Sequence, residues 1–236
     1  MYVCEDAYGS CNASTAQGTS TIIEVEEQYG VKVTGTWRYT EARVLLTAFR
    51  RMEVGIAAQL DISTQESRSI LSQIFAGSTI TRSSHDSPMY WIGVLAAVLT
   101  TGDVSSRPMA NTFAPYYTIG QSGSVSFSFL DGPTIFIWDE TFEYGILLAI
   151  DTIIHETGHL IDYNVSSGYP DILIGSASNM DLFDSVGYKN APSEYALTSP
   201  WELFAETWTA YVNNSLKPEK QGAHITFFNS LLVQWR

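Results

Sequence analysis

Apolar residues recur every three or four positions from Thr40 to Leu60, which predicts an amphipathic helix over this stretch. This spacing places the apolar side chains on one face, because an α-helix has about 3.6 residues per turn. A second helix is expected from Ser63 to Phe75. The residues that carry the first pattern are Ala42, Leu45, Leu46, Phe49, Met52, Ile56 and Leu60.

The segments that follow are rich in β-branched and aromatic residues and are separated by Gly, Pro, Asp and Ser, which favours short strands of a small mixed sheet. Asp131-Gly132-Pro133 is a turn signal between the last two strands. Residues 1–34 are rich in Gly, Ser, Thr and Ala, and we expect an extended N-terminal arm with one strand near Thr21 to Val25. The strands expected in the sheet are Ser78 to Arg82, Met89 to Leu99, Ser124 to Phe129 and Thr134 to Trp138.

The last third of the chain is again helical in pattern. Phe142 to Tyr163 is apolar on more than one side, which predicts a buried helix. A polar stretch from Asn164 to about Ser193 follows it. Further helices are expected from Pro200 to Val212 and near Gly222 to Val233.

A single α+β domain fits this order of helix, sheet and helix. The 236 residues are enough to bury a substantial core, and 45% hydrophobic with 16% charged residues is typical of a folded protein. We expect the domain to span residues 35–236, with a helical and sheet part at 35–140 and a second helical part at 141–236.

The net charge makes two classes of binding partner unfavourable. The chain has 12 basic and 25 acidic residues, and its formal charge of −13 repels nucleic-acid backbones and anionic membrane surfaces. The longest apolar run, Met89 to Leu99, is too short to cross a bilayer, which takes about 20 residues. We therefore expect neither nucleic-acid binding nor membrane insertion. The acidity either attracts basic substrates or keeps an exported protein in solution.

Cysteine usage points to an oxidising compartment. Cys4 and Cys11 are the only cysteines, and the residues between them include Gly9, which allows a small disulfide loop. Two free thiols, or half of a metal site, would leave the same pattern. We expect the disulfide and, with it, secretion from the cell.

The clearest chemical signal is His155-Glu156-Thr157-Gly158-His159, inside the predicted buried helix. Residues four apart lie on one face of a helix, so the two histidines can direct their imidazole nitrogens to one metal ion, with Glu156 beside them. Zinc favours nitrogen ligands, and a catalytic zinc site keeps one position open for a water that a glutamate can deprotonate. Two surface histidines with a chance glutamate between them are the simpler alternative.

The third metal ligand has to come from elsewhere in the chain. Metzincin peptidases would need glycine at position 162 and histidine at position 165, where this chain has Asp162 and Val165. A carboxylate from a later helix is the other common solution, and Glu202 and Glu206 lie four residues apart on one helix face. One can bind the metal while the other accepts a hydrogen bond from a ligand histidine.

Simpler structural roles exist for some of these residues. Ser199-Pro200-Trp201-Glu202 fits a helix capping box with proline at the first helical position, so Glu202 has an alternative role as part of a cap. His85 and His224 have no neighbouring ligand candidates, and we interpret them as ordinary polar residues.

Two segments resemble the anthrax lethal factor-like metallopeptidases, a family that includes the bacterial Pro-Pro endopeptidases. His155-Glu-Thr-Gly-His-Leu-Ile-Asp-Tyr163 is similar to the zinc helix of that family, and Pro200-Trp-Glu-Leu-Phe-Ala-Glu-Thr-Trp-Thr-Ala-Tyr211 is similar to its third-ligand helix. The resemblance implies a zincin-like fold with one zinc ion. It implies further that Glu202 is the third zinc ligand, Glu206 supports a ligand histidine, and Tyr195 stabilises the oxyanion.

The same resemblance suggests how a substrate is bound. The family holds its substrate as an added strand along the sheet edge beside the zinc helix, and the segment 124–129 corresponds to that edge. Asn111 to Gly123 would then be a loop facing the substrate, or an ordinary connection. Pro-Pro specificity is not implied, because Trp201 stands where the Pro-Pro enzymes have an acidic residue. The expected substrate-binding residues are Ser124, Val125, Ser126, Phe127, Ser128 and Phe129.

Together, the residues and the resemblance imply a secreted zinc-dependent endopeptidase that acts on an extended segment of a protein, with Glu156 as its general base. Two other functions fit the same sequence. A domain of this fold can serve as a docking unit without catalysis, and a metal-dependent amidase could act on cell-wall peptides.

Overall fold

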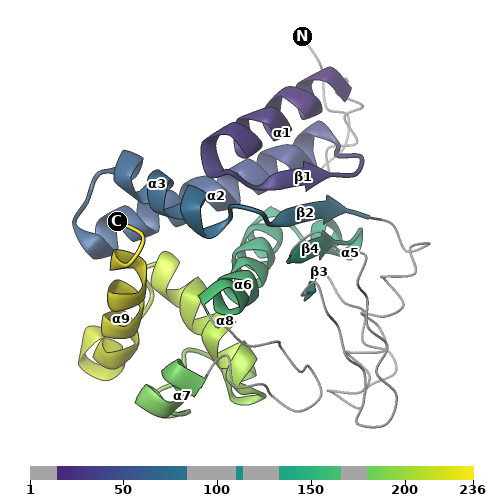
Figure 1. The fold of residues 1–236 in the computed structure, drawn as a ribbon. Helices are drawn as coiled ribbons and strands as arrows, with labels where there is room; N and C mark the ends of the chain where they lie inside the picture. Colours follow the sequence, from purple (N-terminus) through teal and green to yellow (C-terminus); the bar gives the residue numbers. More distant parts are fainter. Residues whose placement is uncertain (1–14, 84–109, 114–132, 166–179) are drawn as a thin grey trace, which may run out of the picture.

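The computed structural model describes residues 15–83, 110–113, 133–165 and 180–236, which form a mixed α+β fold (Figure 1). The helices are α1 (Thr15–Tyr29), α2 (Tyr39–Leu60), α3 (Thr64–Ile74), α5 (Glu140–Glu143), α6 (Ile146–Val165), α7 (Met180–Val186), α8 (Pro200–Val212) and α9 (Pro218–Val233), with a 3-10 turn, η2, at Tyr195–Leu197. The strands are β1 (Lys32–Thr34), β2 (Thr79–Arg82), β3 (Ala110–Phe113) and β4 (Thr134–Ile137).

The four described strands form one small mixed sheet in the order β1-β2-β4-β3. β1, β2 and β4 are parallel, and β3 runs antiparallel to β4. Ile80 of β2 pairs with Ile135 of β4, and all of β4 is buried, as expected of an inner parallel strand covered on both faces. Helix α6 packs against β3 and β4, so the sheet supports the helix that carries the histidine motif.

Helix α2 lies at the centre of the helical part and packs against α1, α3, α6 and α8 (Figure 1). Its predicted apolar face is buried except for Leu60, which is partly exposed. Ser63 caps α3, because its hydroxyl accepts a hydrogen bond from the Glu66 amide at 3.2 Å. The helices predicted over 40–60, 63–75, 142–163 and 200–212 are thus confirmed, with small shifts at their ends.

Helix α1 corrects the expectation of an extended N-terminal arm. Residues 21–25, expected to form a strand, lie inside this helix. Val25 and Tyr29 are fully buried, and the Tyr29 hydroxyl donates a hydrogen bond to Glu53 of α2 at 2.8 Å. The helix therefore belongs to the same hydrophobic core as α2, α6, α8 and α9.

Other elements differ in part from the prediction. The strands expected near 78–82 and 134–138 are present as β2 and β4, whereas β1 and β3 were not predicted. β3 includes the first three residues of the expected loop, Asn111, Thr112 and Phe113. Helix α7 interrupts the expected polar stretch at 164–193. Helix α9 begins before Gly222, at Pro218, and has a break at Gln221 (φ −120°, ψ 22°). The segments 89–99 and 124–129, with Cys4 and Cys11, lie outside the described residues.

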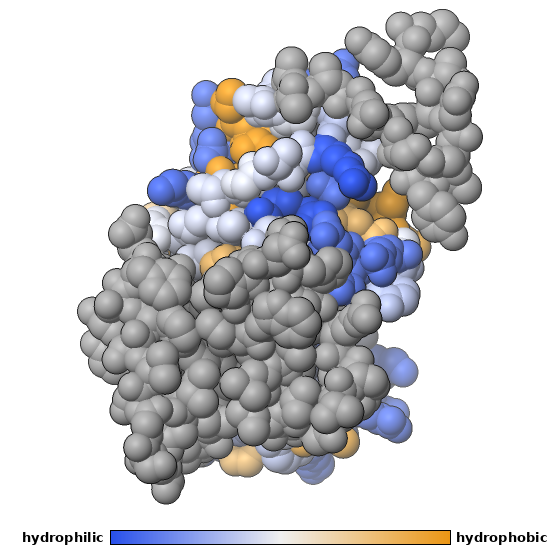
Figure 2. Space-filling view, turned by 90° about the vertical axis from the view of Figure 1, so that its right-hand side faces the viewer, coloured by the Kyte–Doolittle hydropathy of each residue, from blue (hydrophilic) through white to orange (hydrophobic). Residues whose placement is uncertain are grey.

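The surface of the described residues is mixed in character. On the face shown in Figure 2, hydrophobic side chains occur in separate groups among hydrophilic ones. Exposed apolar side chains include Tyr144, Ile146 and Leu147 around the start of α6, and Tyr188 and Leu197 before α8. No described helix is both long enough and apolar enough to cross a membrane.

Candidate metal centre

Helices α6 and α8 approach each other closely beside the histidine motif. A Cβ atom placed on Gly158 of α6 would lie 2.8 Å from the Cα of Ala205 and 3.1 Å from Cδ1 of Trp208 on α8. A residue without a side chain is needed at this point, because packed interiors leave no room for an extra methyl group at such distances. The approach brings the first turns of α8 to the histidines of α6.

Three side chains converge between the two helices. The Nε2 atoms of His155 and His159 lie 3.1 Å apart. Oε2 of Glu202 lies 3.0 Å from Nε2 of His155 and 3.6 Å from Nε2 of His159. This oxygen is buried and has no hydrogen-bond partner of good geometry among the described residues. Acceptor atoms that converge in this way fit a cation, and the three residues could hold a metal ion.

Comparison with protein-family models, curated proteins and solved structures finds no match for this chain. The function therefore has to be inferred from the arrangement of these side chains. Of the predicted site residues, the structure brings together His155, His159 and Glu202, with Glu206 and Tyr195 next to them. The expected substrate strand at 124–129 lies outside the described residues.

Glu202 lies at the cap of α8 and beside the two histidines at the same time. The Ser199 hydroxyl accepts a hydrogen bond from the backbone N–H of Glu202 at 3.2 Å, so Ser199 caps α8 as predicted. The Glu202 carboxylate meanwhile lies beside the two histidines. Backbone and side chain of this residue therefore serve the cap and the cluster separately.

The ring of His155 is held by a chain of hydrogen bonds. Its Nδ1 lies 2.9 Å from Oε1 of Glu206, and the Ser193 hydroxyl donates a hydrogen bond to Oε2 of Glu206 at 2.6 Å. In the neutral ring, a carboxylate at Nδ1 favours the tautomer that carries its proton there, which leaves the lone pair of Nε2 for a metal. Ser193 was not predicted from the sequence.

Ser193 also links the cluster to the turn that carries Tyr195. Its hydroxyl accepts a hydrogen bond from the backbone N–H of Ala196 at 3.1 Å. Tyr195 begins this turn, and its ring centroid lies 5.9 Å from that of His155. One hydroxyl therefore holds both Glu206 and the turn on which Tyr195 is placed.

The charges of the cluster shift the pKa of its members. Burial lowers the pKa of His155, but the carboxylates of Glu202 and Glu206 outweigh it and raise this pKa to about 10. Burial raises the pKa of Glu202, and the two histidines outweigh it, so the net shift is downward and the carboxylate stays ionised. Partial burial, with the carboxylates of Glu202 and Glu156, raises the pKa of Tyr195, which keeps its phenol protonated.

Glu156 lies between the two histidines in sequence and is 7% exposed. Its charge contributes to the raised pKa of both His155 and Tyr195. The side chain is therefore close enough to interact electrostatically with both sides of the cluster. Its position directly after His155 in α6 is the one that the glutamate has in the predicted zinc motif.

A buried hydrogen bond joins α6 to α8 near the cluster. The Thr157 hydroxyl accepts from Nε1 of Trp208 at 3.1 Å and donates to the backbone carbonyl of Ile154 at 2.6 Å. Both side chains are fully buried. Thr157 and Trp208 were not predicted as positioning residues, although both lie within the segments that carry the motif.

Histidine residues outside the cluster have a different environment. His224 of α9 is 2% exposed, and neither ring nitrogen has a hydrogen-bond partner among the described residues. Burial lowers its pKa, so the ring is neutral near pH 7. His224 is thus not the ordinary polar residue that was expected, and His85 lies outside the described residues.

Proposed function

We propose that this chain is a zinc-dependent endopeptidase of zincin-like fold that is secreted from the cell. The observation that carries the proposal is the convergence of His155, His159 and Glu202 from two helices, with Glu156 in the same helical turn as the first histidine. The resemblance of both helices to lethal factor-like metallopeptidases agrees with this geometry.

The spacing of the three ligand atoms suits zinc. Atoms that bind tetrahedral zinc at about 2.0–2.1 Å lie about 3.3 Å from one another. The observed separations of 3.1, 3.0 and 3.6 Å fall on both sides of that value. A circle through three atoms so spaced has a radius of about 1.9 Å, so a single ion can reach all three at normal bond lengths. Two imidazoles and one carboxylate are also a donor set of catalytic zinc sites with an open position.

The neighbouring side chains suit hydrolysis of a peptide bond. Zinc held by this cluster would supply Lewis acidity, polarising the scissile carbonyl and lowering the pKa of a water to about 7. Glu156 would accept the proton of the attacking water and deliver it to the leaving amine. Tyr195, which stays protonated, would donate a hydrogen bond to the developing oxyanion. Glu206 would keep the proton of His155 on Nδ1 throughout.

A peptide substrate would lie extended beside α6. β3 is the last strand of the described sheet on that side, and it packs against α6. Backbone groups at a sheet edge can pair with an added strand, which would hold the peptide in the extended form that reaches a metal centre. This placement supports a protein or peptide as the substrate.

The test compares the zinc-loaded wild type with Glu156→Ala on a peptide library. We expect Glu156→Ala to bind one zinc ion as the wild type does and to lose hydrolysis by about 10²- to 10⁴-fold. Glu219→Ala removes an exposed carboxylate of α9 and should leave both properties unchanged. A folded, zinc-loaded wild type that cleaves no library peptide would contradict the proposed activity and favour a docking domain. Cleavage by Glu156→Ala at the wild-type rate would contradict the role of Glu156.

A further inference from the structure

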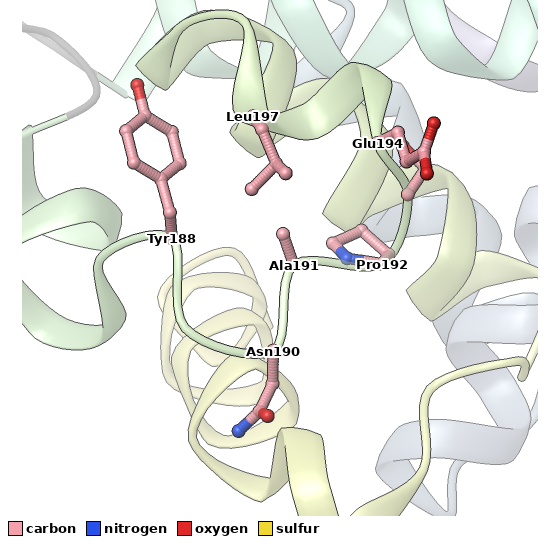
Figure 3. A pocket seen from close by; sticks show the side chains of 7 residues that line it. Tyr188, Asn190, Ala191, Pro192, Glu194 and Leu197 are labelled. Carbon is pink, nitrogen blue, oxygen red and sulfur yellow. The ribbon is translucent and has the colours of Figure 1, made fainter.

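A hollow of ≈ 430 Å³ lies beside the η2 turn (Figure 3). Its wall combines apolar residues (Tyr188, Ala191, Pro192 and Leu197) with polar ones (Asn190, Ser193 and Glu194). In the close-up, Leu197 of η2 and Ala191 point toward one another across the space, with the Tyr188 ring on one side and Pro192 near the other. The hollow is thus formed between the chain that follows α7 and the turn that precedes α8.

The large apolar side chains of this wall are exposed. Leu197 is 49% exposed and Tyr188 is 36% exposed. Exposed apolar side chains that gather in a concave place are typical of a binding site, because contact with a ligand removes them from water. Glu194 is the only charged residue in the described wall, and its carboxylate points away from the space between Leu197 and Ala191 (Figure 3). The chemistry of the hollow therefore favours an apolar occupant over a charged one.

The hollow adjoins the candidate metal centre through one residue, Ser193. Ser193 forms part of its wall, and the same residue donates a hydrogen bond to Glu206, which contacts His155. Glu194 and Leu197 of the wall flank Tyr195 in sequence, so the hollow is lined by the same short turn that carries Tyr195. A peptide held with its scissile bond near Tyr195 would pass this hollow.

We propose that the hollow binds one bulky apolar side chain of the peptide substrate, at a fixed position near the scissile bond. This inference rests on the proposed endopeptidase function and adds a specificity to it. A pocket that fits such a side chain discriminates against a smaller one by about 10- to 200-fold, because the smaller side chain leaves apolar surface in water. One position of the substrate should therefore show a preference of that size for Phe, Leu or Met over Ala.

The experiment measures this preference in the wild type and in two variants of Leu197. Leu197→Trp narrows the hollow, and Leu197→Asp places a charge at its apolar wall. Both variants should reduce the preference at one and the same substrate position to below about 3-fold. Leu197→Asp should also raise the cleavage of peptides with Lys or Arg there, because the new carboxylate would pair with a cation. Val233→Trp, at a 53% exposed position of α9, is the control and should keep the wild-type preference.

The same peptides are also tested for binding to zinc-loaded Glu156→Gln by fluorescence anisotropy, which does not depend on hydrolysis. If the wild type cleaves peptides and neither Leu197 variant changes its preferences, the subsite is overturned, but the proposed endopeptidase function stands. Binding that prefers a bulky apolar side chain, and loses this preference in Leu197→Trp, would support the subsite even if the wild type hydrolysed nothing. Absence of both cleavage and binding would overturn the subsite together with the proposed function.

Discussion

Ala205 of α8 lies directly against Gly158 of α6, where a Cβ on the glycine would come within 2.8 Å of the alanine Cα. Gly158→Ala should therefore push α8 away from α6 and move Glu202 relative to the histidines. Overpacking of this kind destabilises a fold by about 1–3 kcal/mol, which exceeds the helix propensity that alanine gains over glycine, about 1 kcal/mol. We expect a lower free energy of unfolding in urea and a zinc affinity at least about 10-fold weaker in a chelator competition.

Gly222 of α9 gives the matched control for this substitution. A Cβ there would meet nothing within 4 Å. Gly222→Ala should therefore leave zinc affinity unchanged and raise the free energy of unfolding by up to about 1 kcal/mol. If Gly158→Ala behaved like Gly222→Ala, the close contact between α6 and α8 would not be what places Glu202.

Thr157 and Thr207 are both fully buried, but their hydroxyl groups differ in partners. Thr157 accepts the indole N–H of Trp208, whereas the Thr207 hydroxyl has no hydrogen-bond partner among the described residues. Thr157→Val should leave the Trp208 N–H unpaired and lower the free energy of unfolding by about 1–3 kcal/mol. Thr207→Val should be neutral or stabilising, because valine has nearly the shape of threonine and lacks the unpaired buried hydroxyl. Equal losses in the two variants would contradict this assignment.

Ser193 joins the metal cluster to the Tyr195 turn through one hydroxyl. Ser193→Ala should release Glu206 and weaken zinc binding by about 10- to 100-fold, the usual cost of removing a group that orients a ligand. Ser193→Thr keeps the hydroxyl and should therefore keep most of the zinc affinity. If Ser193 only filled space, the larger threonine would not be expected to bind zinc better than alanine does. Zinc affinity is read by competition with a chelator, and a wild-type value for Ser193→Ala would refute the link.

Helix α8 and two residues of the candidate metal centre were accessible to sequence reasoning because local rules fix their positions. Ser199 and Pro200 mark the start of the helix, and α8 begins at Pro200 as predicted. His155 and His159 share a helix face by their spacing alone, so the first two residues of the candidate centre follow from helical geometry. Glu202 required a choice between two carboxylates, and the structure places it with the histidines.

Other features depend on long-range contacts that cannot be predicted from local sequence patterns. Ser193 lies 13 residues before Glu206, and only the fold of the η2 turn brings its hydroxyl to that carboxylate. The Gly, Ser, Thr and Ala content of residues 1–34 suggested an extended arm, yet Gly18 lies in α1, where a Cβ would come within 2.9 Å of the Trp37 carbonyl oxygen. The glycine there permits close packing of a helix, which local propensity cannot predict. β1 is three residues long, too short to leave a periodic signal. β3 is as long as the predicted strands β2 and β4, but it begins with Ala110 and Asn111, residue types that are depleted in strands.

His224 of α9 makes the fold sensitive to acid. The ring is buried without hydrogen-bond partners among the described residues, and burial lowers its pKa. The unfolded chain, in which a histidine has a pKa of about 6.5, therefore binds a proton that the folded chain does not. The free energy of unfolding is therefore unaffected by this group above about pH 6.5, and it decreases as pH falls from there toward the lower pKa of the folded state.

His224→Leu should remove both this pH dependence and the unpaired nitrogens. At pH 7.5 we expect the free energy of unfolding of the variant to exceed that of the wild type by on the order of 1 kcal/mol. The reason is that a buried polar group without partners costs about 1–3 kcal/mol. Its advantage should grow between pH 6.5 and pH 5, where only the wild type has to keep a histidine neutral. The measurement is urea unfolding of both proteins across this range. An advantage that shrinks on acidification would mean that the folded state holds a protonated His224, in which case the ring has a partner that stabilises its charge.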